Sequence, residues 1–225
     1  MKHQRAFTLV ELIIATAIFS FVLIPSLVAI YSTASKHMFQ NYRQNQMHNT
    51  LLVSMKAIQN ALAGATRVDS PAINTNSDRL AFAENVDSVT GCYPIDSNSP
   101  VYWHYFCISG TRFYYHRSNP IGGGGGCPQG GAFGNPYPSC GASTPVRMEL
   151  ANDWTLPTLS VQFTRRSGMF DPDIGLVVTE PDLVEIRLGV NWQPTGGYRA
   201  TARPVVTTLV SKVRVNLSCT RLNCQ

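Results

Sequence analysis

A long apolar segment near the N-terminus constrains this chain more than any other feature. The 25 residues Phe7–Tyr31 follow the short basic stretch MKHQRA, and the one charged side chain among them is that of Glu11. At a helical rise of about 1.5 Å per residue, this segment can cross a hydrocarbon core of about 30 Å. Lys2 and Arg5 flank its N-terminal end, so the positive-inside rule predicts a cytoplasmic N-terminus and an extracytoplasmic remainder.

The alternative to a membrane-spanning stem is a cleaved secretory signal peptide, with Ser32-Thr33-Ala34 as its cleavage site. Such peptides have an apolar core of about 7–15 residues, which is shorter than this segment. The sequence from Ser26 to Ala63 also contains no Gly or Pro, so the helix is expected to continue beyond the membrane. We therefore favour the stem.

Glu11 is the unusual residue of the apolar segment. Placing a carboxylate in a membrane helix costs about 2.5–3.5 kcal/mol on insertion scales. No other charged side chain lies between Phe7 and Tyr31, so the partner is expected to come from another chain or from a freed N-terminal amine. The alternative is a charge that is tolerated at the membrane edge.

The residues KHQRA and the following FTLVELIIA resemble the class III signal of type IV prepilins and type II secretion pseudopilins. The resemblance implies that prepilin peptidase cleaves between Ala6 and Phe7 and that the new amine of Phe7 is N-methylated. It also implies that Glu11, the fifth mature residue, acts in assembly by meeting the Phe7 amine of its own or a neighbouring subunit. The family prefers Gly before the cut, whereas this chain has Ala6.

The same resemblance implies a structural function, that of a minor pilin in a type IV pilus, without a cofactor, a metal or catalytic residues. The expected partners are other pilin subunits through their stem helices, prepilin peptidase, the inner membrane and the pilus assembly platform; no nucleic acid is required. Before assembly the chain would be a single-pass inner-membrane protein with a cytoplasmic N-terminus. Afterwards it would lie in a fibre in the periplasm or at the cell surface. A minor pseudopilin of a type II secretion system is the alternative within the family.

The sequence beyond the membrane segment continues with a helical period. Apolar residues recur at spacings of three and four on one face, and Gly64 supplies a stop. We therefore expect one helix from Phe7 to Ala63, with a kink or loosened turn at Pro25. The apolar face is expected to pack against the chain's own globular body rather than on lipid. Its residues are Met47, Leu51, Met55, Ile58 and Leu62.

The remainder has the period of strands, which predicts an α+β, pilin-like fold in which an antiparallel sheet packs on the long helix. The strongest signal is the aromatic-rich hairpin Val101–Arg117, with its turn at Ser109-Gly110. The expected organisation is a leader (1–6), a transmembrane stem (7–31), an amphipathic helix (32–64) and an extracytoplasmic β-rich body (65–225) with a Gly/Pro loop at 121–144. The other predicted strands are Leu80–Ala83, Val146–Leu150, Leu159–Thr164, Leu183–Val190 and Val205–Leu217.

All six cysteines lie in the body, which topology places outside the cytoplasm. An even number of cysteines in an oxidising compartment favours disulfides over a zinc site. Six cysteines allow 15 pairings, and proximity along the chain suggests Cys92–Cys107, Cys127–Cys140 and Cys219–Cys224.

Charge and motifs argue against several other functions. The whole formal charge of +5 lies at or before Arg67, so the rest of the chain has no net charge that would indicate nucleic-acid binding. Neither G-x-S-x-G nor H-E-x-x-H occurs. The run Gly122–Gly126 lacks the Lys-Ser/Thr of a phosphate loop, and Asp171–Gly175 has too few oxygen ligands for a calcium loop. His104 and His116 could meet across the hairpin, although core or exposed positions are commoner for histidine.

A function of another class is a membrane-anchored module for adhesion or DNA uptake. Its contact surface would consist of the aromatic side chains of the predicted hairpin, which suit a glycan, a surface or DNA. A membrane-anchored enzyme is disfavoured because no catalytic motif is present. The hairpin aromatics are Tyr102, Trp103, Tyr105, Tyr114 and Tyr115.

Overall fold

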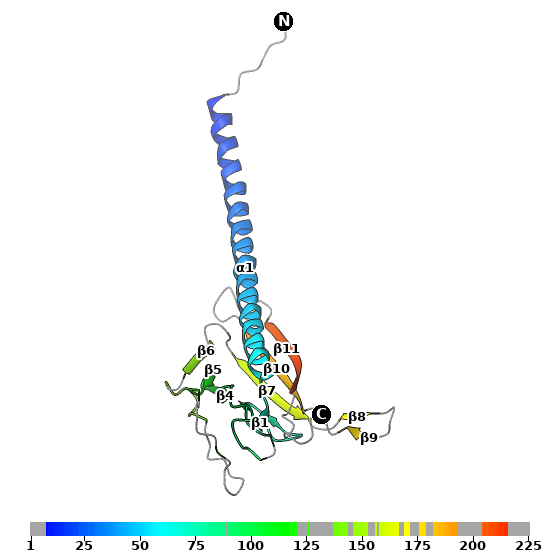
Figure 1. Cartoon of the computed structure of the whole chain (residues 1–225). Coiled ribbons are helices and arrows are strands. Elements are labelled where there is room, and N and C mark those ends of the chain that lie inside the picture. The colour runs from blue at the N-terminus through cyan, green and yellow to red at the C-terminus, as the bar shows by residue number, and fades with distance from the viewer. Residues whose placement is uncertain are drawn as a thin grey trace. The chain divides into compact units, whose positions relative to one another are not determined.

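The computed structural model describes one long helix and a β-rich body (Figure 1). The described residues are 8–88, 90–120, 126, 137–143, 146–152, 156, 158–166, 169–171, 176–178, 182–192 and 204–215. By the density of contacts within each part, the chain forms two compact units, Met1–Asn45 and Gln46–Gln225. Each unit is described below by itself.

The helix α1 runs from Leu9 to Ala63 and continues through Pro25. Its first part forms the described portion of the N-terminal unit, and its last part belongs to the body. The predicted apolar face is confirmed, because all five of its residues, from Met47 to Leu62, are buried. The predicted stop at Gly64 is also confirmed, and a Cβ at this position would lie 2.8 Å from Glu84 Oε1.

A five-stranded antiparallel sheet forms one layer of the body, in the order β1-β3-β4-β5-β6. The hairpin of β4 and β5 pairs Ser109 with Arg112, so its two-residue loop is Gly110-Thr111, one position later than predicted. Gly110 has a φ of +61°, which glycine adopts without strain at the first loop position. The strands are β1 (Arg67–Ser70), β3 (Leu80–Glu84), β4 (Tyr102–Ser109), β5 (Arg112–Arg117) and β6 (Val146–Ala151).

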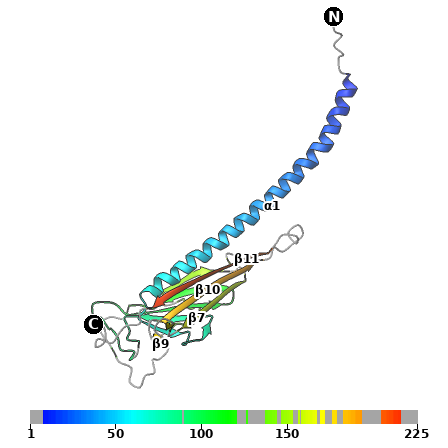
Figure 2. The same ribbon diagram turned by 90° about the vertical axis from the view of Figure 1, so that its right-hand side faces the viewer.

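A second antiparallel sheet has four strands in the order β11-β10-β7-β2, and Figure 2 shows its three long strands side by side. The strands β10 and β11 pair over eleven consecutive positions, from Asp182↔Val215 to Trp192↔Val205. A separate short hairpin consists of β8 (Met169–Asp171) and β9 (Leu176–Val178). The strands of the second sheet are β2 (Asn76–Ser77), β7 (Leu159–Arg166), β10 (Asp182–Trp192) and β11 (Val205–Val215).

One hydrophobic core joins the last part of α1 to both sheets. Leu51 and Ile58 of the helix are fully buried in it together with Phe106 of the first sheet and Ile186 of the second. A hydrogen bond of 2.6 Å from Gln59 Nε2 to Ser211 Oγ also joins α1 to β11. The α+β class and the alternation of β10 and β11 are confirmed, and the predicted antiparallel body consists of two sheets. The four-residue β1 and the two-residue β2, which help to build the two sheets, are too short for a periodic signal.

Candidate functional site

Thr8 and Glu11 form a reciprocal cap at the first turn of α1. The backbone N–H of Thr8 and its hydroxyl both donate to Glu11 Oε2, each at 3.0 Å, and the Glu11 N–H donates to Thr8 Oγ1 at 3.3 Å. This is the S/T-x-x-E capping box, which satisfies N–H groups that a helix start otherwise leaves without partners. The signal is visible as Thr8-Leu9-Val10-Glu11, and sequence reasoning missed it because only charged partners were considered for Glu11.

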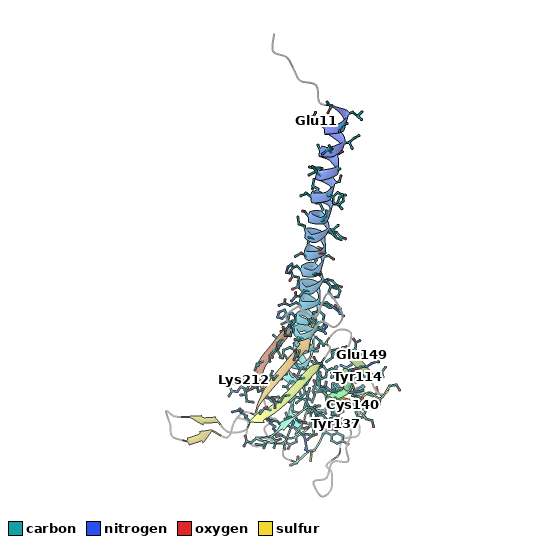
Figure 3. All side chains as sticks on the ribbon, turned by 180° about the vertical axis from the view of Figure 1, so that it is seen from behind. Glu11, Tyr114, Tyr137, Cys140, Glu149 and Lys212 are labelled. Carbon is teal, nitrogen blue, oxygen red and sulfur yellow. A yellow bond between two sulfur atoms is a disulfide. The ribbon has the colours of Figure 1, made fainter. Side chains whose placement is uncertain are left out.

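The cap uses one oxygen of the Glu11 carboxylate. Both bonds from Thr8 end on Oε2, and no residue in the described part of the chain donates to Oε1. The Glu11 side chain is exposed at the N-terminal end of α1 (Figure 3). The geometry therefore leaves Oε1 available to a donor from elsewhere. The predicted cleavage site, Ala6 and Phe7, lies outside the described residues.

The N-terminal part of α1 exposes a continuous apolar surface, in which Leu12, Phe21 and Ile30 are typical. Several hydroxyls on this part of the helix bond within it: Thr16 Oγ1 donates to the Leu12 carbonyl at 2.9 Å, and Ser26 Oγ donates to the Val22 carbonyl at 2.7 Å. Internal satisfaction of polar groups is what a hydrocarbon environment requires. Among the described residues, α1 is the one helix that is long and apolar enough to cross a membrane.

Residues 1–27 match the family model of the prokaryotic N-terminal methylation motif. This motif is consistent with a type IV pilin-like protein. The match covers the basic leader and most of the apolar segment, so it agrees with the class III signal identified from the residues. The motif and the exposed apolar helix are consistent with membrane anchoring before assembly. No curated protein and no solved structure matches the chain.

The body carries a second local structure, the segment 137–143, which we call the clasp. Cys140 forms a disulfide with the fully buried Cys107 of β4, and Tyr137 donates a hydrogen bond of 2.6 Å to Asp69 Oδ2. The N–H of Gly141 donates to His116 Nε2 at 3.1 Å. Tyr114, Tyr137 and Cys140 lie on one side of the body in Figure 3. The clasp therefore covers the face of the first sheet that points away from the core.

The disulfide pairing suggested by proximity is wrong for the described cysteines. Cys107 pairs with Cys140, 33 residues away, which excludes both Cys92–Cys107 and Cys127–Cys140. Cys92 is also disulfide-bonded. Cys127, Cys219 and Cys224 lie outside the described residues. Distance along the chain does not predict this pairing, because the Cys107 side chain lies on the outer face of the first sheet, which the clasp covers.

The aromatic side chains of the hairpin do not form the exposed contact surface that the adhesion hypothesis required. Trp103, Tyr105 and Tyr114 are buried beneath the clasp and the loop before β4. Tyr115 faces the core, where its hydroxyl and His104 Nδ1 share a hydrogen bond of 2.7 Å. Burial raises the pKa of Tyr115 to about 12. These four rings pack within the body, whereas Tyr102 is half-buried and its ring centroid lies 4.9 Å from the Arg117 guanidinium.

His104 and His116 do not meet across the hairpin. The register pairs His104 with Arg117 and Tyr105 with His116, so the two histidines point to opposite faces of the sheet. His104 stacks on Phe82, and its Nε2 lies 3.2 Å from Glu84 Oε1. His116 is fully buried under the clasp, and this burial together with the nearby Arg147 guanidinium lowers its pKa. Both are core histidines.

The structure brings no metal-binding cluster together in its described part, where no three His, Cys, Asp or Glu residues are grouped to hold an ion. Of the glycine run, Gly126 alone is described, and it pairs with Tyr93 through two backbone hydrogen bonds of 3.0 and 2.9 Å. Of the segment Asp171–Gly175, which was considered as a calcium loop, residues 172–175 lie outside the described residues.

Proposed function

We propose that this protein is a minor pilin, a structural subunit of a type IV pilus that prepilin peptidase processes between Ala6 and Phe7. The observation that carries the proposal is the N-terminal methylation motif over residues 1–27, which includes the capped start of an apolar helix. The large body, with its disulfide and long Gly/Pro loop, favours a low-copy or tip subunit. A minor pseudopilin of a type II secretion system has the same motif and is the second candidate.

Glu11 would set the axial register of the incoming stem. During assembly each stem leaves the bilayer and enters a bundle of other stems, where an unpaired carboxylate is costly. Glu11 Oε1 is available to accept from the amine that cleavage creates at Phe7, while Oε2 remains on the Thr8 cap. Opposite charges about 4 Å apart attract by roughly 4 kcal/mol at an effective dielectric near 20. Cleavage and assembly would thereby be coupled.

Processing gives the first prediction. The intact mass of the protein isolated from cells is expected to correspond to a chain that begins at Phe7 and carries one methyl group. Ala6→Gly should be cleaved at least as completely, because Gly is the preferred residue before the cut. A mature chain that begins at Ser35 would instead establish an ordinary signal peptide and remove the pilin proposal.

A second prediction separates the charge of Glu11 from its role in the cap. Glu11→Gln keeps an acceptor at the third helical position, which a capping box allows, but it removes the charge. We expect normal insertion and cleavage and a loss of incorporation into fibres, as for Glu11→Ala; Glu11→Asp, with its shorter side chain, should be partly defective. The measurement is a blot for this subunit in sheared surface fibres and in inner membranes.

Thr8→Ala is the matched control for the cap. It removes the hydroxyl bond to Oε2 and keeps the Glu11 charge, so the first turn should weaken by about 0.5–2 kcal/mol while fibre incorporation persists. If Glu11→Gln is recovered in fibres like wild type and Thr8→Ala is not, Glu11 acts through the helix cap and the register role is wrong. Restoration of pili or of secretion in cells that lack this subunit then distinguishes the two candidate functions.

A further inference from the structure

The outward side of the four-stranded sheet gathers positively charged side chains, and we call this surface the basic face. Residues that pair across antiparallel strands point to the same side of a sheet. The register aligns Arg166, Leu183 and Arg214 in one row and Thr164, Glu185 and Lys212 in the next, on the side opposite to the buried Ile186. The third row is Gln162, Arg187 and Val210. The cations of the basic face are Arg166, Arg187, Lys212 and Arg214.

The basic face has an excess of positive charge among the described residues. The Arg187 and Lys212 side chains are 54% and 62% exposed. Glu185 is the one acid on this side of the three strands; its side chain is 14% exposed and contacts Arg187 Nη2 at 3.2 Å and Lys212 Nζ at 4.0 Å. The local charge is therefore +3, although the chain after Arg67 has no net charge. A count along the sequence could not show this surface, because its residues come from three strands.

The shape of the basic face is as informative as its charge. Neighbouring strands lie about 4.8 Å apart, so Arg166 and Arg214, at the two ends of one row, have backbones roughly 10 Å apart. Most of the remaining outward residues are small or polar, such as Ser160, Gln162 and Thr208. The described outward residues of β7, β10 and β11 include no aromatic side chain. Lys212 lies on the opposite side of the body from the clasp residue Cys140 (Figure 3).

We propose that the basic face binds the phosphate backbone of double-stranded DNA without reading its sequence. Lysine and arginine contacts to phosphates supply most of the affinity of such binding. Proteins that bind single strands place aromatic side chains under the bases, and this face offers none, so a duplex with its phosphates outside fits better. The proposal goes beyond assembly into a fibre and does not depend on it.

The number of cations sets the expected salt dependence. The logarithm of the binding constant falls with the logarithm of the salt concentration by about 0.9 per neutralised phosphate. Three to four contacts therefore predict a slope between about −2.7 and −3.6. Non-specific binding of this kind has dissociation constants of roughly 10⁻⁴–10⁻⁶ M at physiological salt.

The test is fluorescence anisotropy with the full chain in a nonionic detergent and two labelled 30-base-pair duplexes of unrelated sequence. We expect equal affinity for both duplexes and the predicted slope between about 20 and 200 mM KCl. A single strand of thymidines of the same length should bind more weakly. No binding at 20 mM KCl, or tighter binding of the single strand or of a sulfated polysaccharide, would overturn the proposal.

Substitutions locate the binding surface. Arg166→Gln combined with Arg214→Gln should make the slope less steep by about 1.8 and weaken binding by roughly eightfold per cation at 0.1 M salt. Glu185→Gln should tighten binding, because it removes the one acid of the basic face. Arg112→Gln is the matched control: Arg112 is 56% exposed on the other sheet, and its loss should change nothing. Lys36→Gln with Arg43→Gln controls for the two cations in the N-terminal unit's part of α1.

The proposal is wrong if either control variant weakens binding as much as the Arg166 and Arg214 pair does, or if Glu185→Gln leaves the affinity unchanged. Circular dichroism spectra and size-exclusion profiles of all variants show whether each remains folded and monodisperse. The measurement uses purified protein, so its outcome is independent of whether the chain enters a pilus.

Discussion

His116 is a buried base that holds the clasp in place through the bond from the Gly141 N–H to its Nε2. The acceptor role requires a neutral ring, and a proton on Nε2 would turn this contact into a repulsion between two donors. The groups that face His116 are Arg147, which donates to the Gly141 carbonyl at 3.0 Å, and the rings of Tyr105 and Tyr114. None of them supplies a negative charge near neutral pH.

Acid is expected to loosen the clasp. Because the pKa of His116 is lower in the folded than in the unfolded chain, the unfolded chain binds more protons below about pH 6.5. The contribution of neutral His116 to the stability of the folded chain is therefore complete above pH 6.5. It is lost as the pH falls toward the pKa that His116 has in the folded chain. We expect the melting temperature to fall more between pH 7.5 and 5 in wild type than in His116→Gln, which keeps an acceptor but does not titrate. Equal slopes for the two proteins would show that His116 does not carry the effect.

The capping box shows what single-residue reasoning can and cannot recover from this sequence. The cost of Glu11 in an apolar helix was evident from its charge alone. Opposite charge does not identify its local partner Thr8, three residues earlier, because Thr8 donates through a hydroxyl and a backbone N–H. The Thr8 contacts show that Glu11 Oε2 already accepts hydrogen bonds within its own chain. A contact of Glu11 with another subunit would therefore use the second oxygen, Oε1.

At the scale of elements, the Cys107–Cys140 disulfide fixes the clasp to β4 and encloses a loop of 33 residues. The chain-entropy model gives about 3–4 kcal/mol for a loop of this length. Replacing both cysteines with alanine is expected to lower the free energy of unfolding by about this amount, measured by urea denaturation. A change below about 1 kcal/mol would show that the hydrogen bonds of Tyr137 and Gly141 hold the clasp without the bond.

Peptide mapping under non-reducing conditions tests the pairing directly. Chymotrypsin cuts after aromatic residues and so separates Cys92 from Cys107 and Cys127 from Cys140. We expect Cys107 joined to Cys140. We expect Cys92 joined to Cys127, because Tyr93 and Gly126, their neighbours along the chain, form an antiparallel bridge. A linked peptide with Cys92 and Cys107 would contradict both assignments, and reduction before digestion is the control.

The elements differ in how well the sequence predicts them, and the reason is periodicity. The buried face of α1 from Met47 to Leu62 and the alternation around Ile186 follow from repeats within one element. The strand partners of His104 and His116 depend on the register of the hairpin, and a turn assigned one residue early moves every pair by two; their opposite faces follow from a two-residue loop at either position. The disulfide and the basic face depend on which strands become neighbours, which no single segment encodes.

For the whole molecule, the boundary between the two units lies after Asn45. The first unit is helical from residue 9 onward, and the second unit has its own hydrophobic core. The first buried residue of α1 is Met47. We therefore expect a chain that begins at Gln46, exported to the periplasm, to fold and to unfold cooperatively on heating. A chain that begins at Met55 lacks the buried Met47 and Leu51 and should lose at least about 4 kcal/mol of unfolding free energy. Failure of the first chain to fold would show that the body requires its stem.

The eleven-residue pairing of β10 and β11 has one further consequence. In the described sheet β11 is an outer strand, and it pairs along its whole length without a register shift. A long, regular outer strand is a template on which another chain can add a strand and begin to aggregate. Lys212 and Arg214 project from this strand, so two copies that joined their sheets would bring like charges onto one surface. The cations that we assign to a phosphate backbone would thus also disfavour edge-to-edge pairing of two identical bodies.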